Sequence, residues 1–197
     1  MKILLVSWSV LPNNGGSSVI VENLASNFSK DEMVVLGSRE LIQRNNPIKR
    51  KKTGPQFHYF FSELYFFGRG YRYFVWFRKW RFKPLIKKII TIIKQEQIDH
   101  VVAVYPNPFY CHAACIAAKE LGIPFSSYFH NTYIENIAIT DPKAIDIQKE
   151  IFEYSRHIFV MSKGMEKFYS EKYQLNKFIP LVPVSYTHLT LPTICSV

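Results

Sequence analysis

Two adjacent glycines, Gly15 and Gly16, stand between a short apolar run and a segment with helical periodicity. Glycine lets the backbone turn at positive φ and approach a ligand closely, and a helix that starts there offers unpaired N–H groups. This pattern predicts a site for a phosphate or sugar-phosphate group, although a Gly-Gly pair that only makes a turn is commoner. A dinucleotide site is disfavoured, because the loop lacks GxGxxG and residues 32–38 end without an acidic residue.

Other chemistries have little support in the sequence. No Ser/His/Asp set or pair of acidic residues indicates a hydrolase, and we expect neither a metal ion nor another cofactor. Four scattered histidines lack the spacing of metal ligands and are assigned to structure: His58, His100, His112 and His157. No CxxC pair or disulfide framework is present, which favours reduced cytosolic thiols.

The apolar pattern alternates short runs with helical periods, which predicts an α/β fold with a Rossmann-like, doubly wound, mostly parallel sheet. Predicted strands span residues 2–7, 32–38, 57–61, 100–105, 124–130 and 157–162. Predicted helices span residues 17–28, 72–97, 108–122, 141–155 and 162–173. We expect Ser17 or Ser18 to cap the first helix, Pro84 to break or kink the second, Gly122 to end the third and Ser162 to cap the last.

Three segments together resemble the N-terminal half of a retaining family 4 glycosyltransferase, one half of the two-domain GT-B architecture. They are "MKILLVSWSVLPNNGGSSVIVENLA", "IDHVVAVYPNPFYCHAACIAAKELGIPFSSYFHNTY" and "YSRHIFVMSKGMEKFYSEKYQLNKFIPLVP". The order carries the resemblance: a Gly-Gly loop after the first strand, "AKELGIPF" before a strand ending in His-Asn, then "VMSKGM" and a short helix leading to a strand. The resemblance covers residues 1–183 and is weakest over residues 45–94.

The resemblance implies roles for individual residues. Gly15 and Gly16 match the family's paired glycines, whose amides approach the donor diphosphate or an acceptor phosphate. His130 matches a catalytic histidine near the reacting carbon of the donor sugar, and a neutral imidazole can exchange hydrogen bonds with a hydroxyl there. A hydrogen-bonded loop histidine is the alternative. The usual following Asp is Asn131, to which we assign no catalytic role, and Tyr105 is a substrate-binding candidate that could equally serve packing.

A basic aromatic segment follows the predicted strand at residues 57–61. The chain carries a net charge of +10, and residues 69–88 hold eight basic residues and no acid, interleaved with aromatic residues. Such a helix predicts binding to an anionic membrane surface, and it is equally compatible with aromatic residues that pack on the sheet beside solvated cations. The membrane-facing candidates are Arg72, Trp76, Arg78, Lys79, Trp80 and Arg81.

The last residues do not fit the pattern before them. "VSYTHLTLPT" back-translates to a sequence that resembles a transposase mosaic-end sequencing adapter read in frame. We therefore expect residues 184–197 to be an adapter-derived tail, residues 1–183 to form the acceptor-side domain, and a C-terminal donor-binding domain to be absent.

The expected function is acceptor-side glycosyl transfer, inactive in this fragment. The expected partners are a nucleotide-sugar donor, a glycan or lipid-linked acceptor in cell-surface polysaccharide synthesis, and an anionic membrane surface, without nucleic acid because no RNA-stacking motif occurs. No signal peptide or membrane span is evident, so we expect a cytoplasmic protein, peripheral at the inner face of the membrane. The alternative is a non-catalytic α/β module that binds anionic lipid or polysaccharide.

Overall fold

The computed structural model describes residues 1–10, 16–38, 53–62, 71–105, 108–135 and 142–181. Within these ranges a seven-stranded sheet has the order β3-β2-β1-β4-β5-β6-β7, and every neighbouring pair is parallel. The strands are β1 Ile3–Ser7, β2 Met33–Ser38, β3 Gln56–Phe60, β4 His100–Tyr105, β5 Phe125–Phe129, β6 Ile158–Val160 and β7 Phe178–Pro180. The predicted Rossmann-like α/β fold is confirmed.

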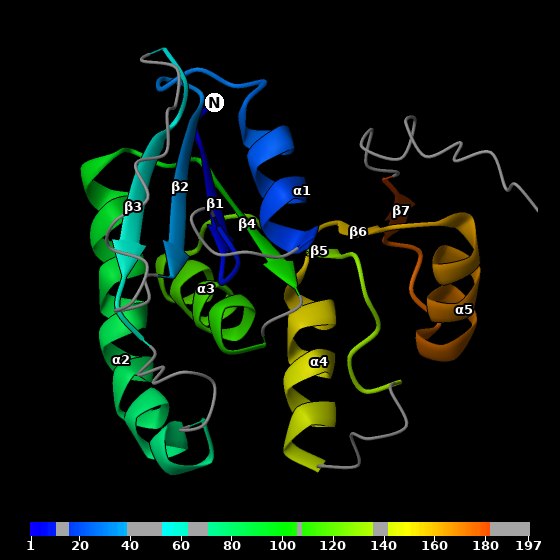
Figure 1. Ribbon diagram of the computed structural model, residues 1–197. Helices are drawn as coiled ribbons and strands as arrows, with labels where there is room; N and C mark the ends of the chain where they lie inside the picture. The colour runs from blue at the N-terminus through cyan, green and yellow to red at the C-terminus, as the bar shows by residue number, and fades with distance from the viewer. Residues whose placement is uncertain (11–15, 39–52, 63–70, 106–107, 136–141, 182–197) are drawn as a thin grey trace, which may run out of the picture.

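Helices connect the strands on both faces of the sheet (Figure 1). They are α1 Gly16–Ala25, α2 Tyr71–Gln95, α3 Pro108–Leu121, α4 Pro142–Tyr154 and α5 Lys163–Tyr173. The larger core cluster joins α2, α3 and α4 to one face of the sheet, and the smaller cluster joins α1 to the other face. Alternate residues of a strand supply the two clusters, since Leu4 and Val6 belong to the first and Leu5 to the second.

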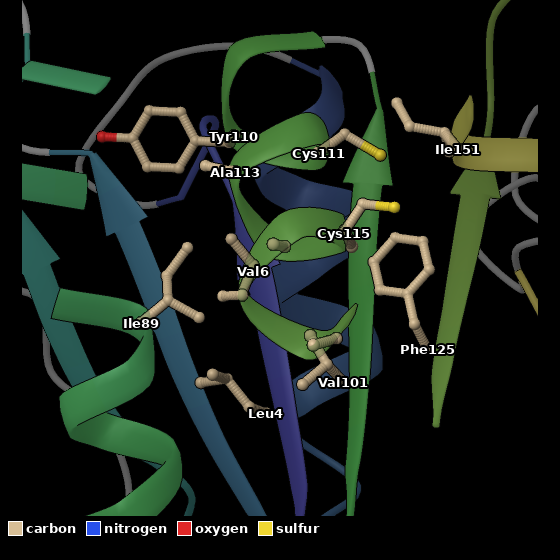
Figure 2. Packing of buried hydrophobic residues seen from close by; sticks show 14 of the residues in the cluster. Leu4, Val6, Ile89, Val101, Tyr110, Cys111, Ala113, Cys115, Phe125 and Ile151 are labelled. Atoms are coloured by element: carbon tan, nitrogen blue, oxygen red, sulfur yellow. The ribbon is translucent and has the colours of Figure 1, made fainter. Parts of the chain in front are cut away.

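Small side chains let α3 lie close to the middle of the sheet. Its buried face consists of Tyr110 followed by cysteine and alanine, and Figure 2 shows Cys115 beside Phe125 of β5 and Cys111 pointing toward Ile151 of α4. Both thiols are unoxidised, and burial raises the pKa of the Cys115 thiol to about 12. They therefore act as small apolar groups.

Several predicted boundaries are confirmed and others are wrong. Ser162 caps α5 by accepting from the backbone N–H of Met165, and Gly122 follows α3 at a φ of 64°. Of the break or kink expected at Pro84, the break is wrong, because α2 continues through it while Leu85 and Ile89 stay buried in the larger cluster. The strand β7 is absent from the apolar pattern, although the family resemblance implies a strand there.

The expected N-cap of the first helix is also wrong. The helix α1 begins at Gly16, so Ser17 and Ser18 lie inside its first turn instead of before it. The Ser17 hydroxyl is hydrogen-bonded to a distant side chain, described below. Gly15 lies outside the described residues, as do the basic run 49–52 and the predicted tail 184–197.

Candidate functional site

The functional candidates gather where parallel strands end. Because β1, β4 and β5 are adjacent and parallel, their carboxyl ends share one edge of the sheet. From β1 the chain runs to β2 and β3 on one side and then crosses back to β4 on the other side of β1, which makes this edge a topological switch point. Ligands of open α/β sheets bind at such points.

Residues 8–10 follow β1 and are fixed against the end of β2. The backbone carbonyl of Trp8 accepts hydrogen bonds from Ser38 Oγ at 2.6 Å and from the Ser38 backbone N–H at 3.4 Å. Val10 is fully buried in the smaller cluster and lies over Gly37. The chain therefore approaches α1 from a defined position.

The N-terminus of α1 provides donors without an opposing acid. Gly16 is the first residue of this ten-residue helix, and its first turn contains no acidic side chain. The unpaired N–H groups and the helix dipole favour an anion at this end. The arrangement is chemically suited to a phosphate oxygen.

His130 meets this helix end from the neighbouring strand. It follows β5 directly, and strand alternation places it on the same face as Tyr128, the face that α1 covers. His130 Nε2 lies 2.8 Å from Ser17 Oγ, and the side chain is only 4% exposed. Burial lowers the pKa of His130 to about 4, so its imidazole is neutral at pH 7.

Tyr105 ends β4 at the same edge but on the opposite face. Its ring stacks on Phe129 with centroids 4.9 Å apart and contacts Tyr133 at 5.2 Å. Burial raises the pKa of its hydroxyl well above the ordinary tyrosine value. The structure thus brings Gly16, Ser17 and His130 together, while Tyr105 belongs to the core beneath them.

The segment after His130 is held by a carboxylate that the sequence analysis did not single out. Glu135 accepts from Lys172 Nζ at 2.9 Å, Tyr173 Oη at 3.1 Å and Tyr169 Oη at 3.2 Å, all from α5. It also accepts from Gln148 Nε2 of α4 at 3.1 Å. Residues 130–135 are therefore attached to two helices, and no local sequence signal marks Glu135, because its partners lie 13 or more residues away.

Two of the other histidines have side-chain hydrogen-bonding partners, whereas the buried Nε2 of His58 has none among the described residues. His100 Nε2 is 2.9 Å from Ser126 Oγ, and His112 Nε2 is 3.0 Å from Glu150 Oε2. In the ranges that the structure describes, no group of three His, Cys, Asp or Glu side chains is arranged to hold a metal ion.

The basic aromatic segment forms α2, and its candidates separate into two groups. Trp76 and Trp80 are 51% and 74% exposed, with ring centroids 5.2 Å apart, and Lys79 is exposed beside them. Arg78 lies over the Phe109 ring at 4.8 Å, and Arg81 lies over the Phe60 ring at 4.5 Å.

Arg81 Nε also donates to the Phe61 carbonyl at 2.9 Å. The two arginines are thus packed against the protein, while the side chain of Arg72 lies outside the described part. Among the described helices, none is long and apolar enough to cross a membrane.

Comparison with known proteins gives a family and a fold. The family model described as Glycosyltransferase Family 4 matches residues 14–183. No curated protein sequence matches significantly. Among solved structures, Anabaena HepE in complex with UDP is similar with a TM-score of 0.61 at 12% identity, covering 93% of this chain and 44% of that one.

Two further solved structures are similar to this chain. The UDP-GlcNAc 2-epimerase of Methanocaldococcus jannaschii has a TM-score of 0.57 at 13% identity, covering 91% of this chain and 45% of that one. Glycyrrhiza uralensis UGT73P12, complexed with glycyrrhetinic acid 3-O-monoglucuronide, has a TM-score of 0.55 at 14% identity, covering 93% and 49%. The chain spans less than half the length of each, and at these identities the likeness shows the fold alone.

Proposed function

The chain belongs to glycosyltransferase family 4, and on that premise we propose that it forms the acceptor-side part of a retaining sugar-transfer site. The donor is a nucleotide-sugar and the acceptor is a glycan or lipid-linked sugar of cell-surface polysaccharide synthesis. The observation that carries the proposal is the meeting of His130 with the first turn of α1 at the switch point of the sheet.

The chemistry of this edge supports the proposal. The N-terminus of α1 offers N–H donors and no acid, which suits the phosphate groups of a nucleotide-sugar or a phosphorylated acceptor. The buried, neutral His130 provides a hydrogen-bonding group that keeps its protonation state over the physiological pH range. Neither feature depends on a metal ion or another cofactor, and the proposal includes none.

Sugar transfer needs surfaces on both sides of the reacting atoms, and we assign only one of them to this chain. Donor selectivity is proposed to reside in a second domain, as the length of the similar structures suggests. The 197-residue chain is therefore expected to bind ligands without turnover. Catalytic transfer from a nucleotide-sugar by this chain alone would contradict that part of the proposal.

Backbone amide NMR shifts of the isotopically labelled chain test the proposed site. Titration with UDP-glucose should shift the amides of Gly16, Ser17 and Asn131 more than those of the distant Glu166 and Lys167. The variant Gly16→Pro, which removes one N–H at the helix end, should weaken the response, while Gly164→Ala in α5 should leave it unchanged. If UDP-glucose and an uncharged disaccharide acceptor both leave this edge unshifted, the proposed site is wrong.

A second part of the proposal is docking on an anionic membrane at the cytoplasmic face. The outer side of α2 carries an exposed stripe that consists of Trp76, Lys79, Trp80, Lys83 and Lys87. Tryptophan suits the headgroup boundary, and each lysine near an anionic surface contributes about 1 kcal/mol. The absence of acidic residues from α2 leaves this attraction unopposed along the helix.

Vesicle sedimentation tests this docking surface. Vesicles of phosphatidylcholine with about 30% phosphatidylglycerol provide an anionic surface. Wild type should bind these vesicles more tightly than vesicles of phosphatidylcholine alone. Trp76→Ala/Trp80→Ala should reduce binding, whereas Ile145→Ala/Phe168→Ala, which removes exposed apolar groups elsewhere, should not. Equal binding of all variants to both vesicles would indicate that the stripe is only a solvated helix face.

The non-catalytic alternative predicts a different pattern. A module that only binds anionic lipid or polysaccharide would respond to vesicles or polyanions and leave the edge formed by α1 and His130 unaffected by UDP-glucose. The family membership favours the transferase.

A further inference from the structure

Neither ring nitrogen of His130 is open to a ligand in the described structure. Nε2 is hydrogen-bonded to Ser17 Oγ at 2.8 Å. Nδ1 is buried and has no hydrogen-bond partner among the described residues. Ser17 is only partly buried, so it is the more exposed member of the pair.

The position of the proton on the ring follows from these surroundings. A neutral imidazole carries one N–H, which lies either on Nδ1 or on Nε2. A proton on Nδ1 would leave a buried N–H without an acceptor, and such orphaned donors are rarer in proteins than under-used acceptors. The favoured arrangement places the proton on Nε2, which then donates to Ser17 Oγ.

This arrangement leaves the Ser17 hydroxyl with its own hydrogen to donate. The Oγ atom accepts from His130, and acceptance of one hydrogen bond strengthens the next donation along the chain of bonds. The neighbouring groups at the α1 N-terminus are also donors, since the N–H groups of a helix's first turn have no intrahelical acceptor and this first turn contains no acid. A ligand that binds these donors must accept hydrogen bonds, and a charged phosphate oxygen accepts the strongest ones.

We propose that Ser17 contacts the phosphate of the ligand and that His130 is a positioning residue which acts through the Ser17 hydroxyl. The inference rests on the proposed function for the identity of the phosphate, which belongs to a nucleotide-sugar or a phosphorylated lipid acceptor. It gives His130 a role through Ser17, in place of the direct contact with the donor sugar that the family resemblance implies.

Binding measurements with a double-mutant cycle test the inference. UDP and geranyl phosphate serve as probes for the two phosphate sources, with an uncharged disaccharide as the comparison. Ser17→Ala should weaken binding of the preferred phosphate probe about tenfold, the loss expected for one hydrogen bond to a charged group. Ser17→Thr should restore binding, and Ser26→Ala, directly after the end of α1, should have no effect.

The cycle separates a positioning histidine from a direct contact. His130→Ala should weaken phosphate binding in the wild-type background and cause no further loss in Ser17→Ala, because the histidine acts only through the hydroxyl. An equal loss in both backgrounds would make His130 a direct contact and overturn the inference. Unchanged binding by Ser17→Ala would overturn it as well.

Imidazole ¹⁵N shifts provide a readout that requires no ligand. The His130 signals should report a proton on Nε2 in wild type and in Ser17→Thr, with a changed tautomer ratio in Ser17→Ala. A proton on Nδ1 in wild type would overturn the inference and leave the proposed function intact. Failure of wild type to bind either phosphate probe would instead overturn the phosphate site, and with it the ligand role of Ser17.

Discussion

Val10 lies so close to Gly37 that a Cβ atom on Gly37 would be 2.5 Å from Val10 Cγ2 and 2.7 Å from its Cβ. The contact joins the segment after β1 to the C-terminal end of β2, and both residues are at the face that α1 covers. Gly37 is therefore required for space, and through Val10 it determines where the chain begins its path to the α1 N-terminus.

Gly37→Ala should lower the free energy of unfolding by about 1–3 kcal/mol, because the added methyl group overlaps a fully buried side chain. Urea denaturation measures the change. Gly164→Ala is the matched control, since its nearest atom is Ser162 Oγ at 3.7 Å and alanine favours the helix. Val10→Ala should partly rescue Gly37→Ala, and a Gly37→Ala variant as stable as wild type would show that the segment shifts freely.

Arg81 and Lys79 should differ in their contribution to stability although they are two residues apart. Arg81→Ala removes the hydrogen bond to the Phe61 carbonyl and the contact with the Phe60 ring, so it should destabilise by about 1–2 kcal/mol. Lys79→Ala alters an exposed side chain and should change stability by less than about 0.5 kcal/mol. Thermal denaturation at equal ionic strength compares them, and equal effects would contradict the assignment of Arg81 to the interior contacts.

The elements of the fold were largely predictable because their apolar runs are strong. The strand at residues 100–105 matches β4 at both ends, since a buried parallel strand has an uninterrupted apolar sequence. The continuous helix through Pro84 was not predicted. Phe82 before the proline and Leu85 and Ile89 after it pack in the larger cluster, and this packing holds α2 together despite the missing N–H. The three-residue β7 is too short to produce a period.

The candidate site was predictable in its place and only partly in its contacts. Parallel strands bring their carboxyl ends to one edge, so the positions of Gly16 and His130 follow from the predicted sheet. The bond between Ser17 and His130 joins residues 113 apart, and local capping preference pointed Ser17 to another role. Tyr105 was a site candidate because it ends a strand at the same edge. Strand alternation instead places its side chain on the opposite face from His130, where it stacks on Phe129.

His130 should make the protein less stable in acid. Its folded pKa of about 4 lies below the ordinary histidine value of 6.5, so the unfolded chain binds the proton more readily. The contribution of the neutral His130 imidazole to the free energy of unfolding is complete above pH 6.5 and is lost as the pH falls toward 4. Between pH 7 and pH 4.5 wild type should lose about 2 kcal/mol more than His130→Gln, measured by urea unfolding.

Other histidines do not obscure this comparison. Burial also lowers the pKa values of His58 and His100, but both remain in His130→Gln and cancel in the difference. Parallel pH dependence of the two proteins would show that the His130 imidazole is hydrated in solution.

Glu135 and Lys172 should be strongly coupled, because the carboxylate is only 7% exposed and the ammonium group is 2.9 Å away. Burial alone raises the pKa of Glu135, but the hydrogen bonds and charge of Lys172, with the Tyr173 hydroxyl, outweigh it and leave the pKa lowered. Its ionised form therefore stabilises the fold at neutral pH. That stability is lost as the pH falls from the ordinary pKa of a glutamate through the lowered pKa of Glu135.

Glu135→Gln should destabilise the protein by about 2–4 kcal/mol at pH 7, because the amide turns donors toward Lys172 and the tyrosine hydroxyls. Lys172→Met should cost less, since Lys172 is 40% exposed and three neutral donors remain on the carboxylate. The double variant should be more stable than the sum of the two losses predicts. Glu171→Gln, from an exposed pair with Lys167, is the control and should be neutral.

The same variants distinguish local attachment from general stability. Residues 131–135 connect His130 to this network, so Glu135→Gln should accelerate amide hydrogen exchange in that segment more than in β1 or β4. The Ser17–His130 bond should weaken with it, visible in the His130 ¹⁵N shifts. A uniform acceleration over all strands would mean that Glu135 only stabilises the whole domain and does not order the residues beside the site.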